Sequence, residues 1–186
     1  MRYGRLLIAS LVLPAAAWAA DPKPDEMVNN PPYASWAVFD KGTTVTQKET
    51  VKLADGTKIQ VDKTLKLLDK TRDKVIVEST VKDDAGGATA SETTISEFPA
   101  KVKRSDVDTP RDSVGSVTEG KEQIDVKGKK VEAEWLEVTS TSGDETTTEK
   151  IWTVREVAGG IVKQTIVKKK GDKVVSESLL ELVEAK

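Results

Sequence analysis

The chain has 186 residues, enough for one domain with a hydrophobic core. It contains no cysteine and no histidine, which excludes disulfides, a lipid on an N-terminal cysteine, and catalysis by a Ser–His or Cys–His pair. With 29 basic and 31 acidic residues the net charge is −2, so the basic surplus typical of nucleic-acid-binding proteins is missing. We therefore expect no nucleic-acid partner and no catalytic residue.

The first twenty residues have the three parts of a secretory signal peptide. Arg2 and Arg5 supply the positive start, Leu6–Leu13 the apolar stretch, and a small-x-small cleavage site ends at Ala19. We expect cleavage near Ala19 or Ala20 and export to the periplasm or the outside of the cell. The apolar run is too short for a membrane-spanning helix, and no other stretch could form one. Loss of the two arginines would bring the net charge to about −4.

Residues 21–32 (DPKPDEMVNNPP) are polar and rich in proline, which predicts an extended N-terminal segment. A single β domain is expected over 33–186. At its start, the sequence PPYASW predicts one short helical turn. We expect Tyr33, Trp36 and Phe39 to plug one end of a sheet.

From residue 43 the apolar residues recur with a period close to two, which predicts strands over 43–53 and 57–68. A two-residue loop between them would place like charges opposite each other. A three-residue loop with Gly56 in the left-handed conformation avoids this. The three-residue loop predicts the cross-strand pairs Val45–Leu65, Val51–Ile59 and Lys48–Asp62.

A third strand is predicted over 74–82 and a weak fourth over 88–98. The odd positions of the third strand continue the apolar face of its neighbour. The stretch 99–117 has two prolines and charges of mixed sign, and we expect it to be a long crossover loop between two halves of the domain.

The most informative stretch is 131–157, where two runs rich in Val, Thr, Ile and Trp flank Gly143-Asp144. Gly-Asp between such runs is typical of a two-residue hairpin loop. The loop predicts a register of favourable cross-strand pairs. These pairs are Trp135–Trp152, Ala133–Val154, Glu137–Lys150, Thr139–Thr148, Leu136–Ile151 and Glu132–Arg155.

Further strands are predicted over 118–127, 161–169 and 173–184, with a corner at 157–160. No simple loop gives the last two strands a register in which every pair is favourable. The sum is an all-β antiparallel meander of about nine strands with almost no helix. One apolar face must be buried. We therefore expect the sheet to curl into an open barrel, with a β-sandwich as the alternative.

The string at 152–163, WTVREVAGGIVK, resembles a Trp-x-Ser-x-x-Val-Pro-Gly-Gly-x-Val-Lys pattern found in uncharacterised secreted bacterial β-sheet proteins. This chain departs from the pattern at Val154 and Ala158, where Ser and Pro are usual. The resemblance covers about a third of the chain and implies no active site. More loosely, the signal peptide and curled meander resemble open barrels of the periplasmic lipoprotein-carrier type, in which helices cover an apolar concavity. This resemblance is one of fold and cannot fix a function.

Three groups of charged residues could in principle carry chemistry, and each has a simpler explanation. Glu132 and Glu134 share a strand face and could act as acid and base, but solvated charges explain them better. Asp106, Asp108 and Asp112 could bind Ca²⁺, but the spacing matches no calcium loop. Residues 168–170 are three lysines, fewer than a lipid-binding cluster has. No metal or cofactor is expected.

Trp135 and Trp152 could stack on a sugar or line an apolar pocket, and the simpler interpretation is a core pair. The leading hypothesis is an exported, non-enzymatic domain whose concave apolar face binds a lipid-like or other hydrophobic ligand. The expected ligand-binding residues are Trp36, Val45, Leu65, Val77, Trp135 and Trp152. The alternative is a structural or protein-interaction domain of the cell envelope, with an envelope protein as partner and no small-molecule ligand.

Overall fold

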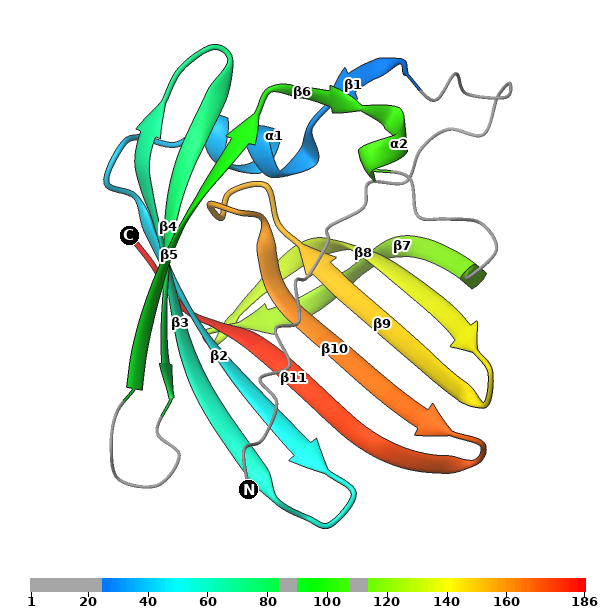
Figure 1. Ribbon diagram of the computed structural model, residues 1–186. Helices are drawn as coiled ribbons and strands as arrows, with labels where there is room; N and C mark the ends of the chain where they lie inside the picture. The colour runs from blue at the N-terminus through cyan, green and yellow to red at the C-terminus, as the bar shows by residue number, and fades with distance from the viewer. Residues whose placement is uncertain (1–24, 84–89, 108–113) are drawn as a thin grey trace.

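A computed structural model describes residues 25–83, 90–107 and 114–186 of the chain. Nine antiparallel strands form one sheet in the order β5-β4-β3-β2-β11-β10-β9-β8-β7, and β1 and β6 form a separate pair (Figure 1). The strands are β1 (Met27–Asn29), β2 (Thr44–Leu53), β3 (Lys58–Lys70), β4 (Lys74–Asp83), β5 (Ala90–Pro99), β6 (Lys101–Lys103), β7 (Val114–Val126), β8 (Lys129–Ser142), β9 (Glu145–Thr153), β10 (Ile161–Lys170) and β11 (Lys173–Ala185). The helices are α1 (Pro31–Ala37) and α2 (Arg104–Val107).

The main sheet consists of two meanders joined along one seam. Strands β2 to β5 form the first meander and β7 to β11 the second, and β2 pairs with β11 between them. The sheet curls so that the two meanders form two walls (Figure 1). Its edge strands, β5 and β7, do not pair with each other, so the sheet stays open. The expected all-β open barrel is therefore confirmed, and the alternative of a sandwich is not adopted.

The registers predicted from turn chemistry are confirmed in both hairpins. In β8–β9, Trp135 lies directly opposite Trp152, and the pairs 136–151, 137–150 and 139–148 follow. In β2–β3, Val45 lies opposite Leu65 and the pairs 48–62 and 51–59 follow. Gly56 has φ +84°, the left-handed conformation that the three-residue loop requires.

The predicted hairpin pairing stops earlier than expected at its open end. Strand β9 ends at Thr153, so the pairs 133–154 and 132–155 do not form as ladder pairs. Arg155 Nη2 instead lies 3.5 Å from Glu134 Oε1. The reason is that the chain leaves the ladder after Thr153 to form the corner before β10.

Register shifts explain why the last hairpin did not fit a simple loop. In β10–β11 the pairing changes between Lys168 and Lys169. Similar irregularities interrupt β9–β10 near Val162, β2–β11 near Val183 and β3–β4 near Leu68. Each bulge adds one residue to one strand and increases the local twist, which favours the curling of the sheet.

The stretch 99–117, expected to be a crossover loop, contains β6, α2 and the first residues of β7. Strand β6 forms because the extended segment Met27–Asn29 pairs with it. Asn30 then anchors this pair to the domain: its Nδ2 donates to the carbonyl of Pro99 at 2.7 Å, and its backbone N–H to that of Ala100 at 3.0 Å. Residues 108–113 of this stretch, residues 84–89, the predicted signal peptide and the first residues after it lie outside the described ranges.

Helix α1 plugs one end of the curled sheet, as the sequence predicts. Trp36 is 4% exposed and packs in a cluster with Val45, Leu67, Val75, Val77 and Ala158. Tyr33 and Phe39 pack partly buried against the same cluster. The indole of Trp36 also lies against Gly159, whose backbone N–H donates to the carbonyl of Ser35 at 3.0 Å. The corner at 157–160 and α1 therefore hold each other in place.

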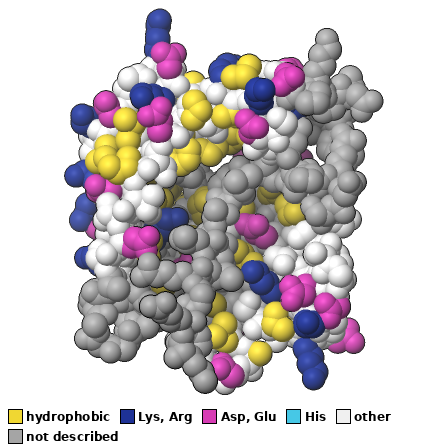
Figure 2. Space-filling model, viewed as in Figure 1, with side chains coloured by type: hydrophobic (Ala, Val, Ile, Leu, Met, Phe, Trp, Pro, Cys, Tyr) yellow, Lys and Arg dark blue, Asp and Glu magenta, His cyan; other side chains and the backbone are white. Residues whose placement is uncertain are grey.

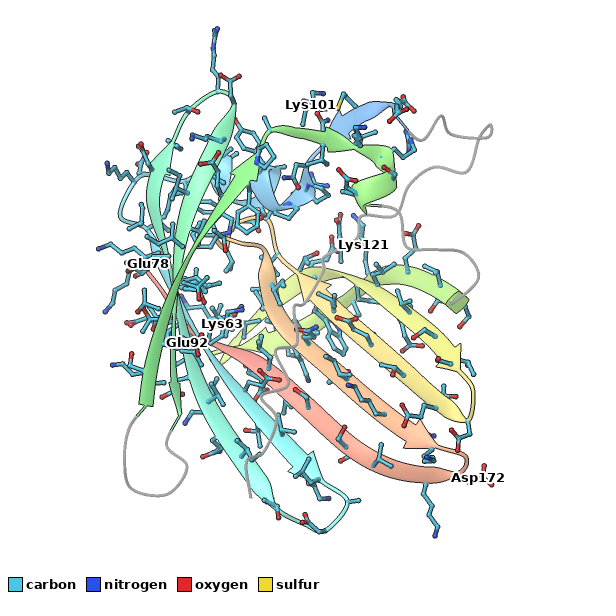
Figure 3. The ribbon with its side chains drawn as sticks, viewed as in Figure 1. Lys63, Glu78, Glu92, Lys101, Lys121 and Asp172 are labelled. Atoms are coloured by element: carbon cyan, nitrogen blue, oxygen red, sulfur yellow. The ribbon has the colours of Figure 1, made fainter. Side chains whose placement is uncertain are left out.

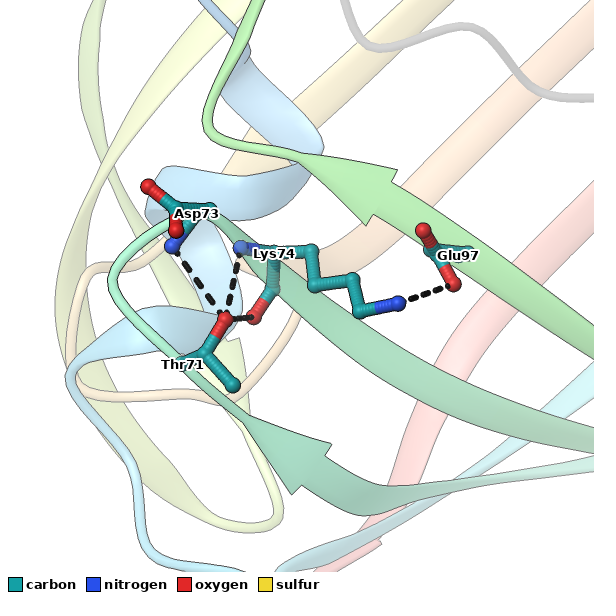
Figure 4. A network of polar contacts seen from close by, with 4 residues as sticks. All are labelled: Thr71, Asp73, Lys74 and Glu97. Atoms are coloured by element: carbon teal, nitrogen blue, oxygen red, sulfur yellow. Dashed lines mark hydrogen bonds and ion pairs between the residues drawn. The ribbon is translucent and has the colours of Figure 1, made fainter.

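A hydrogen-bonded turn joins β3 and β4 (Figure 4), and this turn also contacts α1. Thr71 Oγ1 accepts hydrogen bonds from the backbone N–H groups of Asp73 at 3.2 Å and Lys74 at 3.1 Å. Lys74 Nζ reaches Glu97 on β5 at 2.8 Å. The Tyr33 hydroxyl lies 3.1 Å from the carbonyl oxygen of Thr71, which ties the helix to this turn.

A second cluster packs around β8, β9 and the corner before β10. Its buried members are Ala133, Trp152, Val154 and Val162. Val157 and Leu182 pack against both clusters. The two parts of the core are therefore continuous through the corner.

Candidate binding face

The pairing ladder divides the side chains of the main sheet into two faces, because residues directly opposite each other point to the same side. Lys63 of β3 shares one face with Gln47 of β2 and Leu182 of β11. We call this side the inner face. Figure 3 shows Lys63 on the side of its wall that faces the other wall, and Glu78 on the opposite side.

Many apolar residues of the inner face lie outside both core clusters. They come from both walls, because the ladder carries the same face from β4 across to β8. Ile151, Ile166 and Leu180 are buried. The half-buried members are Val51, Ile59, Val61, Val81, Leu136 and Val138. Figure 2 shows hydrophobic side chains between the walls, next to charged ones.

Polar groups are set into this apolar face on neighbouring strands. Gln164 of β10 is 3% exposed, and its Nε2 donates to Glu149 Oε1 at 2.5 Å. Burial raises the pKa of Glu149, and the hydrogen bond from Gln164 opposes that rise. Gln47, also buried, donates from Nε2 to the carbonyl of Ile161 at 3.0 Å. The Ser178 hydroxyl donates to Glu49 Oε1 at 2.6 Å.

Lys63 is a basic side chain of the same face, and it is half-buried. Burial lowers the pKa of Lys63, and the nearby charge of Glu49 opposes the fall. Among the described residues, no hydrogen bond or ion pair reaches its ammonium group. A cation on an apolar concave face is an arrangement that can orient the polar end of a ligand.

The six residues expected to bind a ligand do not form one site. Trp36, Val45 and Val77 lie together in the cluster under α1, and Leu65 packs against it. Trp36 belongs to the plug, and the other three belong to the end of the inner face that the plug covers. With Val45 at 0% and Val77 at 3% exposure, this end is filled core.

Trp135 and Trp152 lie on the opposite, outer face. Cross-strand pairing links Trp152 to Lys163, Lys163 to Glu181, and Glu181 to Lys48. These side chains therefore point to the face of the sheet opposite the one that carries Val45. Lys150 Nζ lies 4.2 Å from the ring centroid of Trp135 and 4.7 Å from that of Trp152. The Trp152 indole N–H also donates to Glu122. Trp152 is a buried member of the second core cluster, and Trp135 is partly buried and packs against that cluster.

Glu132 and Glu134 line a polar pocket of about 240 Å³ with Lys121, Thr153, Arg155 and others. Lys121 Nζ lies 3.1 Å from Glu134 Oε1. Its hydrogen bond and charge, with a smaller contribution from Arg155, lower the pKa of Glu134. A carboxylate held ionised by two cations is a poor general acid. The pocket therefore has charged walls, and Glu134 is not suited to the role of general acid.

The other charged candidates are separated in the structure. Asp106 lies in α2, while positions 108 and 112 fall outside the described residues. Within the described ranges, no group of three or more acidic side chains could hold a metal ion. At the end of the lysine run, Lys170 pairs with Asp144 at 3.6 Å.

Sequence reasoning missed the polar residues of the inner face, although a signal for them exists. Lys63 falls in phase with Val61 and Leu65, and Gln164 falls in phase with Val162 and Ile166. In a strand with period two, a polar residue in phase with apolar neighbours points the same way as they do. The phase could therefore have placed these polar groups inside.

No protein-family model matches the sequence, and no curated protein matches it. Three solved structures are similar to it at low sequence identity. An exported protein with a YmcC-like fold from Bacteroides fragilis is 14% identical, with a TM-score of 0.46 over 79% of this chain and 96% of its own. An outer membrane lipoprotein-sorting protein domain from Vibrio parahaemolyticus is 10% identical, with a TM-score of 0.28 over 78% of this chain and 85% of its own.

The third is a LolA superfamily protein from Nitrosomonas europaea, 10% identical, with a TM-score of 0.25 over 83% of this chain and 90% of its own. At these values no residue role and no function is transferred from the matches. Neither helix in the described ranges has the length and hydrophobicity that crossing a membrane requires.

Proposed function

We propose that the protein is an exported, non-enzymatic binding domain that holds a hydrophobic small molecule on the inner face of its curled sheet. The observation that carries the proposal is the set of half-buried apolar residues on that face outside both core clusters. Val51, Val61 and Leu136 are members from three different strands. Export rests on the predicted signal peptide.

Burial of apolar surface would favour the binding of a hydrophobic molecule to this face. Each Å² of apolar surface removed from water contributes about 25 cal/mol, so an alkyl chain laid along several strands gains substantial free energy. The plug formed by α1 closes one end, because Trp36 fills the space above Val45 and Val77. A ligand would therefore occupy the half of the face beyond that cluster, near Val51 and Ile59.

Binding of the neutral fluorescent probe N-phenyl-1-naphthylamine tests the proposal. We expect saturable binding, and we expect Val51→Asn or Val61→Asn to weaken it at least tenfold, because each places an amide on the apolar face. Thr50→Asn is the matched control, since Thr50 neighbours Val51 but points to the outer face. Circular dichroism shows whether each variant folds.

Two results would contradict the proposal. One is a wild-type protein that neither binds the probe nor carries a copurified hydrophobic molecule in native mass spectrometry. The other is equal weakening by Thr50→Asn and by both inner-face variants. Either result would favour a structural domain whose apolar face is only core.

A further inference from the structure

The polar groups of the inner face also indicate the kind of ligand. We propose that the ligand is a single-chain amphiphile with an anionic head group, and that the ammonium group of Lys63 binds this head group. This inference rests on the proposed function and adds a head-group class to it. The tail would lie along the apolar residues of the same face.

The position of Lys63 supports this assignment. It lies between Val61 and Leu65 along β3, and opposite Gln47 on β2 and Val81 on β4. Its surroundings are therefore mostly apolar, whereas most lysines of this chain lie on solvated surfaces. A half-buried ammonium group costs free energy of desolvation unless an opposite charge compensates it.

Neither Glu49 nor Glu149 makes an ion pair with Lys63 among the described residues. The negative charge of Glu49 raises the pKa of Lys63, but the two side chains are too far apart to form an ion pair. Glu49 accepts a hydrogen bond from Ser178 instead. Glu149 accepts its hydrogen bond from Gln164. The amide nitrogen of buried Gln47 donates its hydrogen bond to the carbonyl oxygen of Ile161. An incoming anion would supply a charge-assisted hydrogen bond that no described residue gives to Lys63.

The arrangement also predicts selectivity against cationic amphiphiles. A positively charged head near Lys63 would meet a like charge in a partly desolvated place, where repulsion is stronger than in water. A neutral head group would keep the apolar contacts of the tail and lose only the contact with the ammonium group. Ligands of one chain length therefore separate the contribution of the head from that of the tail.

The experiment measures the affinities of the purified protein, by calorimetry below the critical micelle concentration, for three dodecyl amphiphiles. These are dodecanoate, dodecyl phosphate and neutral 1-monododecanoylglycerol. We expect at least one anionic ligand to bind about tenfold or more tightly than the neutral one. The tighter of the two anions then identifies the head group as carboxylate or phosphate.

Lys63→Met tests the residue directly, because methionine keeps an apolar chain of similar length without the charge. We expect it to remove the preference for the anionic ligand and to leave the affinity for the neutral one within about twofold. Lys63→Arg should retain the preference. Lys66→Met is the matched control, because Lys66 is exposed on the outer face of the same strand.

The outcomes distinguish the two proposals. Binding of all three ligands with equal affinity, or an unchanged preference in Lys63→Met, would overturn the head-group assignment and leave the hydrophobic site standing. Absence of binding for all three ligands would overturn both. If Lys63→Met fails to fold, Lys63→Arg and Lys63→Gln replace it, and loss of the preference in Lys63→Gln alone supports the assignment.

Discussion

The indole of Trp135 occupies the space in which a side chain at position 120 would lie. Gly120 is its direct cross-strand partner on β7, and a Cβ atom added there would be 2.8 Å from Trp135 Cζ2. Lys150 covers the same ring from the neighbouring strand. The absence of a side chain at Gly120 therefore lets the tryptophan lie flat across β7.

Gly120→Ala should destabilise the protein by about 1–3 kcal/mol, because the indole is held on its other side and cannot move away freely. Chemical denaturation measures the change in the free energy of unfolding. Gly115→Ala on the same strand is the control, since a Cβ there meets only the Thr139 carbonyl oxygen at 3.4 Å. Equal effects of the two substitutions would show that the contact with Trp135 is unimportant.

The pKa of the Glu122 carboxyl group should depend on Trp152. The indole N–H of Trp152 is the main cause that lowers the pKa of Glu122 below its ordinary 4.5, and Lys150 adds to it. A depressed carboxyl pKa contributes stability above the unfolded-state value, and this contribution is lost as pH falls through the folded-state value. Carboxyl NMR titration of Trp152→Phe should show the Glu122 pKa rising toward 4.5.

Glu134 serves as the internal reference in that titration. Its pKa is lowered mainly by Lys121, with no contribution from Trp152. It should stay low in Trp152→Phe. If both carboxyl groups shift together, the substitution has disturbed the whole region and the assignment to the indole fails.

Glu149→Gln should stabilise the protein at neutral pH. Burial raises the pKa of Glu149, so its ionisation costs the folded state more than the unfolded one. The cost is absent below the unfolded-state pKa and grows as pH rises toward the folded-state value. The melting temperature of Glu149→Gln should therefore exceed that of the wild type at pH 7 and match it near pH 4.

Glu145→Gln is the comparison for this change, because Glu145 is exposed at the start of the same strand. It should leave the melting temperature within about one degree, as surface substitutions usually do. A lower melting temperature of Glu149→Gln at pH 7 would contradict the prediction. That result would mean that the carboxylate, and not only its hydrogen bond with Gln164, supports the fold.

Gly159→Ala should cost about 1–3 kcal/mol of stability. Gly159 has φ +75°, which an L side chain rarely adopts, and a Cβ there would be 3.1 Å from Trp36 Cζ2. Gly42→Ala provides the comparison, because Gly42 has φ +93° with open space around it. Denaturation of both variants separates the backbone strain, present in each, from the contact with Trp36. A smaller loss in Gly159→Ala than in Gly42→Ala would contradict this packing.

Short-range features of the fold could be predicted from the sequence, because turn chemistry and cross-strand pairs act over a few residues. The pairing of Trp135 with Trp152 and of Val45 with Leu65 followed from the loops beside them. The pairing of β2 with β11 could not be predicted, because neither strand carries a signal for a partner more than a hundred residues away.

The candidate site was predicted less well than the fold. To decide whether Trp135 and Trp152 lie on the same face as Val45, one must know which alternate residues of every intervening strand point to that face. This depends on the strand order. Only the ladder from Trp152 through Lys163 and Glu181 to Lys48 reveals that they lie on the outer side. Lys63 was overlooked because a charged residue is usually assumed to face solvent.

The seam between β2 and β11 has a consequence for how the chain acquires its structure. The first long strand to be synthesised pairs with the last one. Residues 44–53 and 176–185 can therefore pair only after all the residues between them have been synthesised. Such distant partners slow folding. Until then, β2 remains an unpaired edge able to capture a neighbouring polypeptide, so shortening the chain before residue 176 should yield aggregates rather than a smaller working domain.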